Sequence, residues 1–149
     1  MLCNLADMED IKRFCNEFRD KYSKLDILVC NAGVITLDRR ETKDELELQF
    51  GVNHIGHFLL TTSLLPLIQT AGNARIVVVG SGAHKIGKID FNNIPLRKGY
   101  SVFSAYGRSV KRLYHEKPPW YKKCRFTTAY KYLITESNLY FQLTDKFIK

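Results

Sequence analysis

No segment of this sequence is long and apolar enough to cross a membrane. The longest apolar stretch, Phe58 to Ile68, is interrupted by Thr61, Thr62 and Ser63, and it is shorter than the roughly 20 residues that a spanning helix needs. The N-terminus has no basic segment followed by an apolar run. We therefore expect no transmembrane segment, no signal peptide and no membrane anchor.

The cysteines show no pattern typical of a metal site or a disulfide framework. Cys3, Cys15, Cys30 and Cys124 include no C-x-x-C pair, and none has a histidine nearby at metal spacing. We expect free thiols in a reducing compartment, and hence a cytoplasmic location. A disulfide or a zinc site is the alternative interpretation.

The positive charge is concentrated in one part of the chain, which has a formal net charge of +8. Residues 1–106 contain 13 Lys+Arg and 12 Asp+Glu, whereas residues 107–149 contain 10 and 3. Basic and aromatic residues alternate around 120–123, which is the composition of single-stranded nucleic-acid sites. Since unrelated basic sequence supplies the same residues, a tail that binds nucleic acid or an acidic partner is only the alternative function.

Helical and strand patterns alternate along the first part of the chain. Asp7 opens a helix with apolar residues at helical spacing, and Ile27–Cys30 is typical of a buried parallel strand. Thr42 and Glu45 have the spacing of a capping box, which predicts a long helix to about Gln69. The later segments predict, in order, a strand at 74–79, a loop at 81–98 and a helix from Ser101 through Tyr106. This order favours an α/β fold with a parallel sheet covered by helices on both faces.

Four short motifs occur in a fixed order along these elements: Cys30-Asn31-Ala32-Gly33, Val52-Asn53-His54-Ile55-Gly56, Val79-Gly80-Ser81-Gly82-Ala83-His84 and Ser104-Ala105-Tyr106-Gly107-Arg108-Ser109. With these motifs the chain resembles the short-chain dehydrogenase/reductase family, particularly its retinol-dehydrogenase-like members. Residues 25–33 and 50–60 also resemble the family's typical sequence. The resemblance implies a partial Rossmann-like, doubly wound parallel sheet.

The resemblance also implies the chemistry of the site. In this family a hydride moves between NAD or NADP and a carbonyl or alcohol carbon, here of a small apolar, retinol-like substrate. By resemblance Tyr106 exchanges the proton and contacts the cofactor, while Ser81 holds the substrate oxygen. Asn53 corresponds to the asparagine that supports a catalytic lysine through a water.

The cofactor residues follow from the same resemblance. Asn31, Ala32 and Gly33 correspond to a motif whose small residues let the backbone approach the adenosine side of the cofactor, although a strand-ending turn would need the same glycine. Asn4 falls where the family usually has an aspartate that accepts from the adenine amine. An asparagine can accept there through its amide oxygen, but without the charge.

Two departures from the family weaken the prediction of activity. Val110 occupies the position of the catalytic lysine, and Lys111 is rotated by about 100° around the helix axis. The glycine-rich turn that binds the pyrophosphate is absent as well. We therefore expect an N-terminally incomplete chain that starts near the third strand of the fold, binds the cofactor poorly and is inactive.

The match ends near Ser109, so we divide the chain into residues 1–109, a partial cofactor-binding domain, and residues 110–149, a divergent and poorly ordered tail. Pro118 and Pro119 would end any continuing helix. A frame error, an aberrant splice or a degenerate gene would replace the true second half with unrelated residues. Alternatively, a pseudoenzyme has acquired a basic tail.

Two further expectations concern metals and partners. His54 and His57 are three residues apart, which is a legitimate metal-ligand spacing, but the nearest preceding carboxylate, Glu47, is about two helical turns away. We expect these histidines and His84 to be structural, with no metal site. The family commonly pairs its long helix and its tyrosine helix across a dimer interface, which implies a homodimer.

Overall fold

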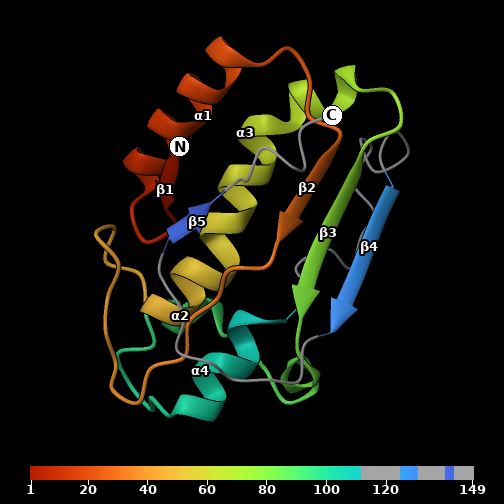
Figure 1. Cartoon of the computed structure of the whole chain (residues 1–149). Coiled ribbons are helices and arrows are strands. Elements are labelled where there is room, and N and C mark those ends of the chain that lie inside the picture. The colour runs from red at the N-terminus through yellow and green to blue at the C-terminus, as the bar shows by residue number, and fades with distance from the viewer. Residues whose placement is uncertain (112–124, 131–139, 143–149) are drawn as a thin grey trace.

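The fold alternates helices with parallel strands, as the sequence predicts (Figure 1). The computed structural model describes residues 1–111, 125–130 and 140–142. The residues on which the nucleic-acid alternative depends, around 120–123, and Cys124 lie outside the described residues. Within the described residues, no helix has both the length and the apolarity needed to cross a membrane.

The main sheet has three parallel strands in the order β2-β3-β4. β2 (Ile27–Cys30) and β3 (Arg75–Gly80) run side by side with Cys30 opposite Val78, so both end at the same edge. The predicted parallel sheet is confirmed. β4 (Arg125–Tyr130) pairs with β3 along its whole length and comes from the tail. This strand was not predicted from the sequence, although β-branched and aromatic residues are frequent in the segment.

The first strand lies outside the main sheet. β1 (Leu2–Asn4) pairs antiparallel with β5 (Tyr140–Gln142), and the two form a separate two-stranded sheet. In the common strand order of doubly wound folds, the third strand is separated from the fourth by the first and second strands. In this structure β1 and β2 accordingly belong to different sheets.

Two long helices pack beside the sheet and close the core (Figure 1). α1 (Met8–Lys21) begins at Asp7, whose carboxylate accepts hydrogen bonds from the backbone N–H groups of Glu9 and Asp10, as expected for an N-cap. α3 (His57–Thr70) packs against α1 and contacts β2. The core includes, from these elements, Ile11, Phe14, Phe18, Leu28, Leu60, Leu64, Ile68 and Ile76. Burial of each such side chain contributes about 1.5–3 kcal/mol.

The predicted capping box is wrong, and the helix starts later. Thr42 accepts hydrogen bonds from Asp44 and Leu46 within a turn, and Glu45 has a left-handed backbone with φ of 61°. α2 (Leu48–Phe50) begins instead at Glu47, whose buried carboxylate caps the helix. Residues 51–56 then form a π-helical segment that continues into α3.

The segment between β3 and the last described helix contains two 3-10 turns, at Gly82–Lys85 and Phe91–Asn93. α4 (Val102–Ser109) follows, and the Ser101 hydroxyl accepts from the backbone N–H of Ser104 at its start. The prediction of a helix from Ser101 is confirmed, and the helix extends to Ser109. α4 lies at the carboxyl end of the sheet, beyond the ends of β2 and β3 (Figure 1).

Candidate functional site

The carboxyl edge of the parallel sheet gathers the sequence motifs. Because β2 ends at Cys30 and β3 at Gly80 in the same direction, residues 31–33 and Ser81 leave the sheet on the same side. Ligands of open α/β sheets bind at this edge. The strand arrangement therefore brings two of the four motifs together.

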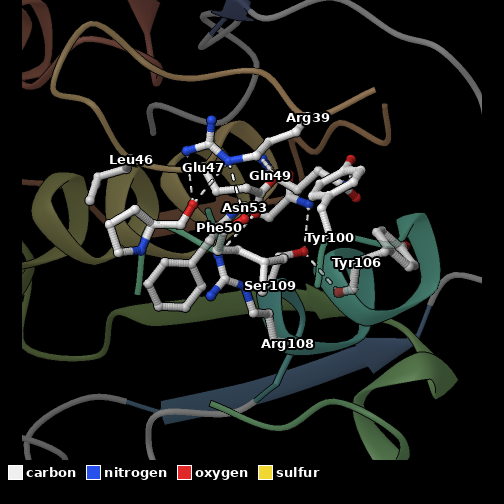
Figure 2. A network of polar contacts seen from close by, with 12 residues as sticks. Arg39, Leu46, Glu47, Gln49, Phe50, Asn53, Tyr100, Tyr106, Arg108 and Ser109 are labelled. Atoms are coloured by element: carbon white, nitrogen blue, oxygen red, sulfur yellow. Dashed lines mark hydrogen bonds and ion pairs between the residues drawn. The ribbon is translucent and has the colours of Figure 1, made fainter. Parts of the chain in front are cut away.

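Asn53 joins the loop after β2 to α4 (Figure 2). Its Oδ1 accepts from the backbone N–H of Val34 at 2.7 Å, and its Nδ2 donates to the carbonyl of Val34 at 2.9 Å. The same Nδ2 donates to the Ser109 hydroxyl at 2.9 Å. Only a side chain with both a donor and an acceptor, such as an amide, can pair with the backbone in this way. Asn53 thus holds two segments that are far apart in the sequence.

The backbone around Asn53 is a π-helical segment, which is often found at functional sites. His57 is buried, and its Nδ1 lies 3.1 Å from the carbonyl of Asn53. Since a carbonyl only accepts, Nδ1 carries the proton. Gly56 allows the segment to approach the chain after β1, because a Cβ there would lie 2.7 Å from the carbonyl of Leu5.

Ser81 lies in the turn that packs against α4. Its hydroxyl accepts from the backbone N–H of Ala83 at 3.3 Å, and its carbonyl accepts from His84 Nδ1 at 2.7 Å. The turn and the residue Gly87 after it approach α4 backbone to backbone. A Cβ on Gly107 would lie 3.1 Å from the carbonyl of Ala83, and a Cβ on Gly87 would lie 2.1 Å from the carbonyl of Gly107. This contact places the segment of Ser81 beside the helix of Tyr106.

Tyr106 lies on α4, and its carbonyl accepts from the Ser109 hydroxyl at 2.9 Å (Figure 2). A chain of contacts therefore runs from Val34 through Asn53 and Ser109 to the backbone of Tyr106. Val110, at the position of the family's lysine, follows the last residue of α4. Lys111 points elsewhere, because its Nζ donates to the carbonyl of Gly87 at 2.6 Å.

Of the remaining predicted cofactor residues, Asn31, Ala32 and Gly33 follow β2 at this edge, whereas Asn4 ends β1 outside the main sheet. Asn31 is exposed, and its backbone N–H donates to the carbonyl of Val29. Ala32 is partly buried, and a Cβ on Gly33 would lie 3.3 Å from Asn53 Oδ1. At the end of β1, Asn4 Oδ1 accepts from the backbone N–H of Ala6 at 3.0 Å.

Sequence reasoning missed Glu47, Arg108 and the role of Ser109. Glu47 and Arg108 form a buried ion pair, although charged residues are expected at the surface. Ser109 stood in the tyrosine motif, but its contact with Asn53 spans 56 residues. No local spacing could reveal either contact.

The histidines and thiols have perturbed pKa values that follow from burial. Burial lowers the pKa of His54 to about 4 and also lowers that of His57. It raises the pKa of Cys3 to about 12 and those of Cys15 and Cys30 to about 11. These three cysteines are free, as predicted. In the described part of the chain, no three His, Cys, Asp or Glu side chains converge as metal ligands.

Comparisons with known proteins agree with this architecture. Residues 1–93 match the family model described as short chain dehydrogenase. Mouse retinol dehydrogenase 14 is 42% identical over 106 residues, which cover 71% of this chain and 32% of the relative. Human polyprenol dehydrogenase is 36% identical over 113 residues, which cover 73% of this chain and 34% of the relative. The chain thus spans about a third of the length of the curated relatives it matches.

Solved structures show the same fold. A protein from Mycobacterium paratuberculosis is 37% identical, has a TM-score of 0.64, and is matched over 72% of this chain and 38% of its own. A metagenomic short-chain oxidoreductase solved in complex with NADP has a TM-score of 0.63 at 19% identity, over 86% of this chain and 56% of its own. The partial Rossmann-like α/β fold is confirmed. With its matching motifs and these relatives, this chain belongs to the short-chain dehydrogenase family.

Proposed function

We propose that this chain carries the alcohol- and carbonyl-handling part of an NAD(P)-dependent oxidoreductase site, but does not catalyse hydride transfer as it stands. The contacts of Asn53 with Val34 and Ser109 give this proposal its main support. They hold the loop after β2 against the helix of Tyr106, so one amide organises both sides of the site.

Each proposed role rests on the chemistry of a side chain at the sheet edge. The phenol of Tyr106 can donate a proton to a carbonyl oxygen or accept one from an alcohol. The hydroxyl of Ser81, on the turn packed against α4, can hold that oxygen by a hydrogen bond. The names of the relatives, retinol and polyprenol dehydrogenases, support an apolar alcohol or carbonyl as the substrate.

The residues at this edge fit a nicotinamide dinucleotide in part. Exposed Asn31 and the small residues Ala32 and Gly33 follow a parallel strand, where nucleotides bind in such sheets. NAD or NADP would supply or accept the hydride when bound. The family's lysine also contacts the ribose, and Val110 cannot replace that contact.

Among the described residues, the two basic side chains that follow Tyr106 on the chain are both engaged elsewhere. Arg108 is paired with buried Glu47, and Lys111 donates to the carbonyl of Gly87. A lysine at position 110 would add a positive charge one helical turn after the phenol, where it favours the ionised form. We attribute the expected inactivity to this substitution together with the absent glycine-rich turn, and millimolar cofactor offsets the weak binding that the missing turn implies.

The test compares Val110→Lys with the wild-type chain at millimolar NADPH and an apolar aldehyde such as retinal. We expect the wild-type chain to oxidise NADPH no faster than the background without protein. The lysine variant should oxidise it at least about 100-fold faster than the wild-type chain. Val110→Met, which has a similar stem without the charge, is the matched control. Adding Tyr106→Phe should abolish the gain. A folded lysine variant without any gain would refute the proposal.

A further inference from the structure

A buried ion pair joins the two elements that carry Asn53 and Tyr106 (Figure 2). Arg108 Nη2 lies 3.2 Å from Glu47 Oε2, and the two side chains are 2% and 0% exposed. Two charges removed from water are retained only where their geometry and hydrogen bonds compensate for the lost hydration. The contacts that Glu47 and Arg108 make with neighbouring segments therefore indicate which elements the pair holds in place.

The Glu47 side binds the start of the helix that leads to Asn53. Its Oε1 accepts from the backbone N–H of Gln49 at 2.8 Å, and its Oε2 accepts from that of Phe50 at 3.1 Å. A carboxylate is favoured at a helix N-terminus by the free N–H groups and the helix dipole. Glu47, which precedes Asn53 by six residues, thus fixes where α2 begins.

The Arg108 side reaches across to the same helix and to the loop before α4. Its guanidinium carbon lies 4.9 Å from the centre of the Phe50 ring, and its Nη1 donates to the carbonyl of Asn93 at 3.3 Å. Among the described residues, Nε has no hydrogen-bond partner. All contacts of the guanidinium are internal, so Arg108 presents no charge to a ligand.

We propose that Glu47 and Arg108 are positioning residues that set the rotation of α4, and with it the placement of Tyr106 and Ser109 against Asn53. Arg108 stands two residues after Tyr106 and next to Ser109. Because α4 has only eight residues, an anchored side chain near its end restricts how the whole helix can rotate. The inference rests on the proposed function only in treating Tyr106 and Ser109 as residues of an oxidoreductase site. How α4 is held in place does not depend on catalysis.

The alternative is a pair that contributes stability alone. The neutral variant Glu47→Gln with Arg108→Met separates the two roles. The introduced glutamine keeps an acceptor for the helix N-terminus, and the introduced methionine keeps an apolar stem over Phe50. Neutral replacement of a buried pair commonly preserves stability, whereas removal of one partner does not.

The experiment follows the side-chain amide of Asn53 by ¹H–¹⁵N NMR in the full chain, with the signal assigned by its loss in Asn53→Asp. In the wild type this amide is bonded to Val34 and Ser109. In the neutral double variant we expect cooperative unfolding to persist, while the Asn53 signal shifts and its hydrogen exchange accelerates about tenfold or more. Lys12→Met, which removes an exposed ion pair on α1, should change neither the Asn53 signal nor its rate of hydrogen exchange. An unchanged Asn53 signal in the double variant would overturn the proposal.

A second measurement uses the wild-type chain and needs no variant to fold. Hydrogen exchange should give the backbone amides of Phe50 and Ser109 the same free energy of opening, because the pair couples both segments. If Ser109 opens while Phe50 stays protected, the coupling does not exist and the inference falls. Both readouts are independent of turnover, so a failed carbonyl assay would refute the proposed function and leave this inference standing.

Discussion

The partly buried imidazole of His54 predicts a loss of stability in mild acid. Its ring stacks on Phe50 with centroids 5.1 Å apart and an interplanar angle of 8°, and burial lowers its pKa to about 4 from 6.5. The unfolded chain therefore binds a proton at a higher pH than the folded one. Stability is fully present above pH 6.5 and is lost progressively as the pH falls toward 4.

The size of the effect follows from the two pKa values. Between pH 7.5 and 4.5 the difference amounts to about 2.5 kcal/mol of unfolding free energy. His57, whose pKa burial also lowers, acts in the same direction. The paired carboxylates Asp7, Asp10 and Glu41 have lowered pKa values, so their stabilisation is lost only at still lower pH.

Urea unfolding followed by circular dichroism at several pH values between 7.5 and 4.5 measures this loss. The variant His54→Phe keeps a ring against Phe50 but cannot be protonated, so its stability should fall much less over the same range. Two results would refute the reasoning: a wild-type stability that stays constant down to pH 4.5, or an equal slope in the two proteins.

Two other substitutions test the packing of α4. Gly87→Ala should lower stability by about 2–3 kcal/mol in thermal unfolding, because its Cβ would lie 2.1 Å from the carbonyl of Gly107. The exposed neighbour Lys88→Ala should change stability by less than about 0.5 kcal/mol, and equal effects would contradict the close contact. We also propose a homodimer through α3 and α4, where Phe58 and Phe103 are 43% and 73% exposed. Phe103→Asp should then convert a dimer to a monomer in sedimentation, and a wild-type monomer would rule the dimer out.

The sequence predicts helix starts and strands correctly where the residues that determine them are close together in the chain. Asp7 caps α1, and Ser101 caps α4, because a short polar side chain can bind the free N–H groups directly after it. The strands at 27–30 and 75–80 could be predicted because an apolar, β-branched run suits a buried sheet. These parts of the fold follow from local chemistry.

The predictions failed where contacts between segments distant in the sequence determine the structure. Thr42 and Glu45 have capping-box spacing, but Glu47 caps the helix because its carboxylate also pairs with Arg108. The contact between Asn53 and Ser109 depends on how two helices pack, which no spacing encodes. The sequence therefore predicts the motif residues but not the polar network that connects them.

We propose that this site keeps the groups that handle the substrate oxygen but lacks the cation needed for hydride transfer, and isotope labelling can test both halves of that proposal. Val110→Lys would be incubated with an apolar aldehyde and NADPH deuterated at the transferable position of its nicotinamide, and the alcohol would be analysed by mass spectrometry. We expect Val110→Lys to yield an alcohol that carries one deuterium and Val110→Met to yield no alcohol. Absence of labelled alcohol from the folded lysine variant, or an equal yield from the methionine variant, would contradict it.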